Sequence, residues 1–357
     1  MDPRFWKGKK VLVTGHTGFQ GAWFSLWMQS LGAKVVGFSL PPPTRPSLFE
    51  LARVGDGMQS VVGDVRDLAA LQTCFEDHRP EFAVHFAAQA LVRRSYREPV
   101  LTIATNVLGT THFLEAARHS PGLQAILCIT SDKCYLPRAL ERGYRESDPL
   151  GGTDPYSASK AAAEWVIEAY RRSYVPGEAG SGLPPLASAR AGNVIGGGDW
   201  AEDRLVPDAM QALLERRDIV LRHPEAVRPW QHVLDPLRGY LMLLERLSLR
   251  GEEFADAWNF GPGAETSKPV SYLAERLVSL WGEAAVCRGE AAPSWHEDAV
   301  LRLDATLAKE RLGWEPILSL EEAAEWIVQW YRSYRQGRDV RELSLSQIKD
   351  YERRVLS

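Results

Sequence analysis

Residues 10–21 of the chain read KVLVTGHTGFQG, and this stretch decides the fold. Its first half is short and β-branched, which is typical of a buried parallel strand. Its second half spaces three glycines as G-x-x-G-x-x-G before an apolar-periodic helix. A strand, a glycine-rich turn and a helix together place a pyrophosphate at a helix N-terminus. We therefore predict a doubly wound, Rossmann-type parallel α/β sheet. The predicted dinucleotide contacts in this turn are Gly15, Thr17, Gly18, Phe19, Gln20 and Gly21.

Further apolar segments supply the rest of the predicted sheet: residues 34–39, a strand ending within 61–67, residues 82–86, 124–130 and 186–190. Asp64 and Val65 follow the third strand, where Asp64 would accept a hydrogen bond from the adenine amine or cap the next helix. The small residues Ala87 and Ala88, with Gln89, follow the fourth strand and would let the backbone approach a cofactor. His85 is expected to be a buried, hydrogen-bonded core residue.

The second strand lacks the acidic residue that commonly holds the adenosine ribose. It ends instead at Ser39, before a proline run, and Arg45 follows. Ser39 would serve a free ribose hydroxyl, whereas Arg45 would favour a 2′-phosphate. We predict NAD as the cofactor, with NADP as the alternative.

Two segments carry candidate catalytic groups. The strand at 124–130 delivers Ser131, Asp132 and Lys133 at its carboxyl end, where open α/β sheets bind ligands. A helix then opens after Asp154, and Tyr156 and Lys160 lie one turn apart on one face of it. An ammonium group beside a phenol lowers the pKa of the phenol, so this pair can exchange a proton with a sugar hydroxyl.

The later part of the chain suggests a second, substrate-binding region. Residues 191–200 are rich in glycine and fit either a ligand-shaped loop or a linker between domains. Arg228 and Arg204 would clamp phosphates or lie exposed. We divide the chain into residues 1–190, the NAD(P)-binding domain, and 191–357, mainly the substrate domain, with about 228–262 returning to the first domain.

The bulk composition is that of a soluble globular protein. The chain has 357 residues, of which 45% are hydrophobic and 25% charged, and its net charge of −4 gives no reason to expect nucleic acid or an anionic membrane as a partner. Its four cysteines show no metal-ligand or disulfide spacing, and the first residues contain no apolar signal segment. We expect a cytoplasmic protein without a metal site.

Taken together, the glycine turn, Ser131 and the Tyr156-x-x-x-Lys160 pair resemble the extended short-chain dehydrogenase/reductase pattern. Within this superfamily, the sequence resembles the CDP-D-glucose 4,6-dehydratases. These two levels of resemblance rest on the segments TGHTGFQG (14–21), HFAAQ (85–89), TSDKCY (130–135), DPYSASK (154–160), RAGNVIGGGDW (190–200) and RPWQHV (228–233). The related dTDP-glucose dehydratases carry Asp-Glu where this chain has Asp132-Lys133.

The resemblance implies a reaction: transient oxidation at the sugar C4, elimination of water across C5 and C6, and return of hydride to C6. Tyr156 would take the C4 hydroxyl proton, Ser131 would orient that hydroxyl, and protonated Asp132 would assist departure of the C6 hydroxyl. Lys133 would act either as the C5 base or as an electrostatic stabiliser.

By the same resemblance, Asn193 would line the sugar diphosphate and Trp200 would face the cytosine. The product would feed deoxysugar synthesis for surface polysaccharides such as O-antigen. A homodimer is expected through helices at 106–118 and 156–170. The alternatives are a 4-epimerase or another nucleotide-sugar dehydratase of the same fold, and a cofactor-sensing binding protein.

Overall fold

The computed structural model describes residues 2–138, 140–175, 182–263, 266–283, 286–289 and 302–356. Its centre is a seven-stranded sheet in the order β11-β6-β5-β4-β1-β2-β3, and every neighbouring pair is parallel. This confirms the predicted doubly wound fold. The strands are β1 (Lys10–Thr14), β2 (Lys34–Ser39), β3 (Gln59–Val62), β4 (Phe82–His85), β5 (Ala125–Ile129), β6 (Leu186–Ala191) and β11 (Ala257–Phe260).

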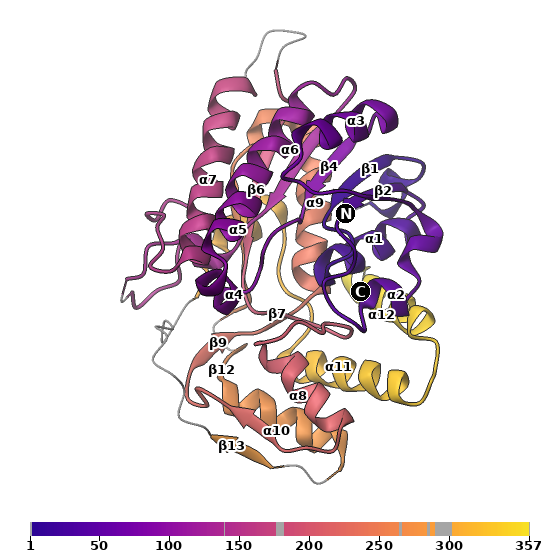
Figure 1. The fold of residues 1–357 in the computed structure, drawn as a ribbon, viewed down its shortest axis with the longest axis vertical. Coiled ribbons are helices and arrows are strands. Elements are labelled where there is room, and N and C mark those ends of the chain that lie inside the picture. Colours follow the sequence, from indigo (N-terminus) through magenta and orange to yellow (C-terminus); the bar gives the residue numbers. More distant parts are fainter. Residues whose placement is uncertain are drawn as a thin grey trace.

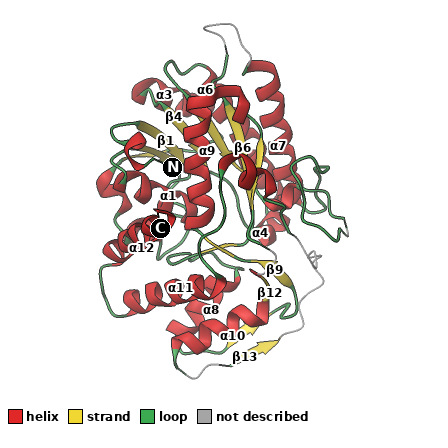
Figure 2. Ribbon diagram, turned by 180° about the vertical axis from the view of Figure 1, so that it is seen from behind, coloured by secondary structure: helices red, strands yellow, loops and turns green. Residues whose placement is uncertain are grey.

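Helices cover both faces of this sheet (Figure 2). Side chains alternate along a strand, so Val11 and Val13 of β1 join one core cluster and Leu12 joins the other. The first face is covered by α1 (Phe19–Ser30), α9 (Leu234–Arg250) and α12 (Val340–Leu356). The second is covered by α3 (Leu68–His78), α6 (Gly109–Arg118) and α7 (Pro155–Tyr174). Because both faces are buried, the central strands are apolar throughout.

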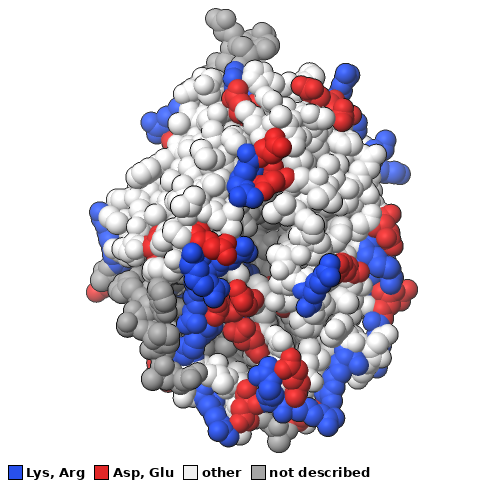
Figure 3. Space-filling view, in the orientation of Figure 1, with Lys and Arg blue, Asp and Glu red and all other residues white. Residues whose placement is uncertain are grey.

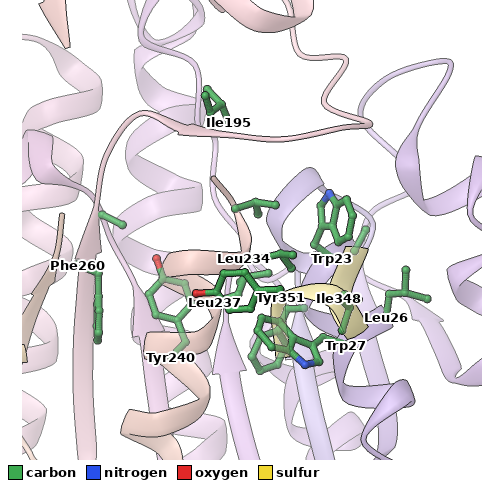
Figure 4. Close-up of a cluster of buried hydrophobic side chains, with 14 of the residues drawn as sticks. Trp23, Leu26, Trp27, Ile195, Leu234, Leu237, Tyr240, Phe260, Ile348 and Tyr351 are labelled. Atoms are coloured by element: carbon green, nitrogen blue, oxygen red, sulfur yellow. The ribbon is translucent and has the colours of Figure 1, made fainter. Parts of the chain in front are cut away.

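The larger core cluster joins the beginning and the end of the chain (Figure 4). Trp27 of α1 and Tyr351 of α12 meet edge to face, with ring centroids 5.7 Å apart. The Trp27 indole Nε1 donates to Glu352 Oε1 at 2.7 Å, and the Tyr351 hydroxyl donates to Asp235 Oδ1 of α9 at 2.7 Å. The last helix therefore completes the packing of the first.

A smaller unit lies beyond the carboxyl ends of the sheet strands, in the lower part of Figure 1. It contains α8 (Leu205–Leu214), α10 (Val270–Trp281) and α11 (Leu320–Arg335). Three strand pairs accompany them: β7 (Val194–Ile195) with β10 (Gln231–His232), β9 (Val227–Pro229) with β12 (Ser267–Pro269), and β8 (Ile219–Leu221) with β13 (Cys287–Gly289). The chain leaves the sheet after β6 and returns to it through α9 and β11.

Local signals in the sequence set the helix starts that matter for the site. Asp154 caps α7 as predicted, because its Oδ1 accepts from the Tyr156 and Ser157 amides at 2.9 and 3.0 Å. The alternative that Asp64 caps the helix after β3 is wrong. Asp67 caps α3, and its Oδ1 accepts from the Ala70 amide at 3.0 Å.

The remaining short helices lie on the sheet unit: α2 (Leu48–Leu51), α4 (Val92–Arg97) and α5 (Pro99–Ile103). The helix predicted to begin at Asn106 opens instead with a π-helical turn, Ala104–Leu108, before α6. Acidic and basic side chains are interspersed over the face drawn in Figure 3. Within the described residues, no helix is both long and apolar enough to cross a membrane.

Candidate active site

The glycine turn between β1 and α1 is too tight for side chains. Gly15 has φ +73°, and a Cβ there would lie 2.6 Å from the Ala87 amide nitrogen. A Cβ on Gly21 would lie 2.2 Å from the Gly15 carbonyl oxygen. Gly18 is the N-cap of α1 and provides no side-chain acceptor for the first amides of the helix. The turn therefore fits a dinucleotide pyrophosphate, which would accept from those amides.

Residues at the ends of β2 and β3 form the next part of the predicted cofactor site. The hydroxyls of Thr17 and Ser39 lie 2.8 Å apart, and the side chain of Arg45 is exposed. The Asp64 carboxylate accepts from the backbone amide of Arg66 at 2.9 Å and from its guanidinium, and these hydrogen bonds lower the pKa of Asp64. The adenine role of Asp64 stays a prediction.

The loop after β4 is held by its own side chains. Gln89 is buried. Its side-chain nitrogen donates to Thr102 Oγ1 at 2.9 Å, and its side-chain oxygen accepts from the Leu91 backbone amide at 2.7 Å. These bonds fix the backbone that follows Ala87 and Ala88. His85 is buried between the hydroxyls of Thr14 and Thr110, at 2.8 and 3.2 Å, as expected of a core histidine.

The structure brings Ser131, Asp132 and Tyr156 together at the carboxyl end of β5. Ser131 caps the short 3-10 turn Asp132–Cys134. Its Oγ accepts from the Lys133 amide at 3.2 Å and donates to Asp132 Oδ1 at 2.9 Å. Tyr156 lies on the first turn of α7, and the Ser131 side chain lowers the pKa of its hydroxyl. Ser95 holds this turn, since its Oγ accepts from the Tyr156 amide at 3.2 Å.

Burial dominates the titration of the Tyr156 and Lys160 pair. It raises the pKa of Tyr156 to about 12, although the Ser131 hydroxyl and the positive charge of Arg204 oppose it. The expected lowering of this pKa by Lys160 is therefore wrong as a net effect. Burial also lowers the pKa of Lys160 to about 8, against the negative charge of Glu164. The Lys160 ammonium donates to the Ile129 carbonyl oxygen at 3.5 Å.

Burial is the main influence on the titration of Asp132. Burial raises the pKa of its carboxyl group above the usual value, and the positive charges of Lys133 and Arg228 and the Ser131 hydrogen bond only partly oppose this. Gly192, just after β6, lies against it: a Cβ on Gly192 would be 1.8 Å from Asp132 Oδ2. The carboxyl group thus fills the space that this glycine leaves.

The predicted substrate residues come from the smaller unit and its connections. Arg204 donates to Asp199 Oδ2 at 3.3 Å, and Arg228, within β9, donates to the Val227 carbonyl oxygen at 3.1 Å. Asn193 has φ +51°, and its carbonyl oxygen accepts from the Gln231 amide at 3.3 Å. Trp200 is half-buried and meets the rings of Trp330, Tyr331 and Tyr334 edge to face. The positive charges of Arg204 and Arg228 lower the pKa of Tyr156 and of Asp132, respectively. Trp200 packs within an aromatic cluster.

Residues 11–259 match the model of a family described as the NAD dependent epimerase/dehydratase family. The chain belongs to this family. Membership, together with the glycine turn, identifies the protein as an NAD-dependent enzyme, and a short-chain dehydrogenase/reductase fold follows from the sheet order and its structural relatives.

Members of the family differ clearly in their similarity to this chain. A CDP-glucose 4,6-dehydratase from Salmonella typhimurium is 46% identical over 98% of both chains. A UDP-glucose 4-epimerase from Halalkalibacterium halodurans is 28% identical over 92% of this chain and 97% of its own. Among solved structures, a dTDP-glucose 4,6-dehydratase from Streptomyces venezuelae with NAD bound is 26% identical, with a TM-score of 0.77 over 93% of this chain and 99% of that one.

Sequence reasoning missed several residues of this family site. Ser95 holds Tyr156, and Gly192 makes room for Asp132, yet neither stands at a recognisable motif spacing from its partner. It also missed the buried ion pair in which Arg190 Nη2 lies 2.7 Å from Glu164 Oε2. Glu164 offered one signal: it lies four residues after Lys160, on the same helical face.

Proposed function

We propose that the chain is a CDP-D-glucose 4,6-dehydratase, which converts CDP-D-glucose to CDP-4-keto-6-deoxy-D-glucose and water. The observation that carries this proposal is the buried Asp132 carboxyl, hydrogen-bonded to Ser131 beside Tyr156. A carboxyl group with a raised pKa can donate a proton to a leaving hydroxyl. A 4-epimerase oxidises and reduces C4 alone and has no use for an acid at this position.

Oxidation at C4 would depend on Tyr156, Ser131 and Lys160. Tyr156 would receive the proton of the C4 hydroxyl, and the Ser131 hydroxyl, which lowers the pKa of Tyr156, would orient the same oxygen. The Lys160 ammonium would stabilise the phenolate of Tyr156 as it forms. Bound NAD would supply the hydride chemistry, accepting hydride from C4 and returning it to C6.

Elimination would depend on Asp132 and Lys133. Asp132, protonated, would give its proton to the C6 hydroxyl, which leaves as water. Lys133 follows Asp132 in the same 3-10 turn, where it would remove the C5 proton or stabilise the charge that develops on the sugar. A proton would return to C5 when hydride reaches C6, from Lys133 if it is the base. Asp132 and Lys133 precede Cys134, whose side chain is fully buried.

The finer parts of the proposal concern the nucleotide and the assembly. The relative with 46% identity supports CDP rather than another nucleotide, and Arg204 and Arg228 would bind its phosphates. We further propose a cytoplasmic homodimer. Exposed apolar side chains on α5, the π turn and α7 support the dimer, since monomers rarely expose such contiguous groups. These side chains are Val100, Ile103, Leu108 and Trp165.

The test of function is incubation of the purified protein and NAD with CDP-, dTDP-, UDP- and GDP-glucose, followed by mass analysis. We expect a product lighter by one water from CDP-glucose and much less product from the other three. An isobaric product would indicate a 4-epimerase instead. No conversion of any of the four sugars would favour a cofactor-sensing binding protein.

A further inference from the structure

A fully buried carboxylate lies one helical turn beyond the Tyr156 and Lys160 pair. Glu164 of α7 is 2% exposed and accepts hydrogen bonds from three directions. Thr130 donates to its Oε1, and Ser188 and Arg190 of β6 donate to its Oε2 at 2.9 and 2.7 Å. Thr130 directly precedes Ser131, so this one carboxylate connects the catalytic loop, the catalytic helix and the neighbouring strand.

Arg190 extends the same network to the other end of the catalytic loop. Its Nη1 donates to the Tyr135 hydroxyl at 2.8 Å and to the Glu146 carbonyl oxygen at 3.1 Å, and its guanidinium lies 5.0 Å from the centre of the Tyr135 ring. The Tyr135 hydroxyl in turn donates to Asn259 Oδ1 at 2.7 Å. Residues 130 and 135 are therefore fixed by one ion pair, on either side of Ser131, Asp132 and Lys133.

We propose that Glu164 is a positioning residue of the reaction: it holds the loop that bears Ser131 and Asp132 against the catalytic helix, and it supplies the negative charge that offsets the buried Lys160 ammonium. This inference rests on the proposed function, since it concerns the same C4 oxidation. A buried ammonium needs a nearby opposite charge to stay charged. The charge of Glu164 raises the pKa of Lys160 against the effect of burial.

Other groups around Lys160 do not replace this charge. They are His85 of β4, Cys128 of β5 and Cys134 of the catalytic loop, with the Ile129 carbonyl as hydrogen-bond acceptor. Burial lowers the pKa of His85 to about 3, so it is neutral. Burial raises the pKa of both thiols, so these are neutral too. Among the described residues, Glu164 is thus the anionic group that raises the pKa of Lys160.

The test compares Glu164→Gln with wild type by stopped flow, with NAD and CDP-glucose, following absorbance of reduced nicotinamide from pH 6 to pH 10. In wild type the rate should stop increasing near the pKa of Lys160, about 8. We call the pH at which the rate stops increasing the break. In Glu164→Gln we expect the break to move about one pH unit lower, and the constant rate above it to be ~10-fold lower, because a nearby charge shifts a buried pKa by this order.

Glu164→Gln leaves Arg190 buried without a carboxylate, which can prevent folding. The double variant Glu164→Gln, Arg190→Gln removes both charges and should regain thermal stability while keeping the shifted break. A third variant, Thr130→Val, keeps the charge and removes only the bond to the loop. It should lower kcat about 10-fold, within the range for displaced catalytic groups, with KM and the break unchanged.

Asp235→Asn is the matched control. Asp235 is a buried carboxylate far along the chain from the site, and it accepts from the Ile317 amide and the Tyr351 hydroxyl. Its variant should lose thermal stability but keep the wild-type break. A wild-type break in the folded Glu164 variants, or a wild-type kcat in Thr130→Val, would overturn the inference. If wild type does not dehydrate CDP-glucose, the proposed function fails, and the same profile is recorded with the sugar nucleotide that it oxidises.

Discussion

Tyr156 and Asp132 belong to different halves of the proposed reaction, although Ser131 is hydrogen-bonded to Asp132 and also lowers the pKa of Tyr156. Tyr156→Phe removes the C4 base, so we expect neither reduced nicotinamide nor product. Asp132→Asn keeps Tyr156, Ser131 and Lys160, and so should still oxidise C4 while releasing product about 10²–10⁴-fold more slowly. Stopped-flow absorbance and product mass measure the two halves separately. Normal product release by Asp132→Asn would mean that the acid is another group.

Lys133 can be tested apart from its neighbour in deuterated water. If Lys133 removes the C5 proton, Lys133→Met should lose exchange of that position with solvent, whereas Asp132→Asn should retain it. Methionine keeps the length and apolar stem of the side chain without its charge. Retained exchange in Lys133→Met would instead assign Lys133 to electrostatic stabilisation. Mass spectrometry of the sugar after quenching measures the deuterium incorporated.

The pH dependence of C4 oxidation follows from Tyr156 and Lys160. Below its pKa of about 12, the phenolate fraction of Tyr156 grows tenfold with each pH unit. Above its pKa of about 8, the cationic fraction of Lys160 falls by the same factor. The rate depends on both fractions, so it should increase up to about pH 8 and then stay level. A rate that keeps increasing to pH 10 would show that the charge of Lys160 is not needed.

At the scale of elements, the turn before α1 offers a matched pair of glycine changes. A Cβ on Gly21 would lie 2.2 Å from the Gly15 carbonyl oxygen, whereas a Cβ on Gly18 would lie at an ordinary 3.4 Å from the same atom. Gly21→Ala should therefore destabilise the protein by about 1–3 kcal/mol, the usual cost of overpacking, and Gly18→Ala much less. Thermal unfolding measured without added NAD compares the two. Equal losses would show that the turn relaxes freely.

The sequence was most informative where one element carries its own signals. Residues 10–21 predicted β1, the turn and α1, and Asp154 with Pro155 predicted the start of α7, because strand composition, glycine spacing and capping are local. The helix around Asn106 was placed correctly, but its π-helical turn, which contacts α7 in the fold, was not predicted. The short strand pairs of the smaller unit escaped prediction, since two or three residues carry no periodicity.

The individual residues of the site could be predicted, but the burial and the charges around each of them could not. Ser131, Asp132, Tyr156 and Lys160 were recognisable from their spacing and position in the chain. The net pKa of Tyr156 was not, because it depends on the degree of burial, which only the assembled fold sets. Glu164 and Arg190 are 26 residues apart and belong to different elements, so no local pattern predicts their pairing.

At the scale of the whole molecule, the exposed apolar side chains of α5, the π turn and α7 predict a dimer. Trp165 is 60% exposed on α7, and Leu249 is equally exposed on α9, which covers the opposite face of the sheet. Trp165→Glu should give a monomer, because a charge in an apolar interface is costly, whereas Leu249→Glu should not change the mass. Light scattering at micromolar concentration measures both. A monomeric wild type would contradict the proposal.

The contact between α12 and α1 has a consequence for how this protein emerges from the ribosome. Trp27 is translated well before its partners Tyr351 and Glu352. At roughly 5–20 residues per second, more than three hundred residues of synthesis separate them, so an apolar surface on α1 stays uncovered for many seconds. A nascent chain stalled before α12 would display that surface, and it is there that a chaperone would find this polypeptide.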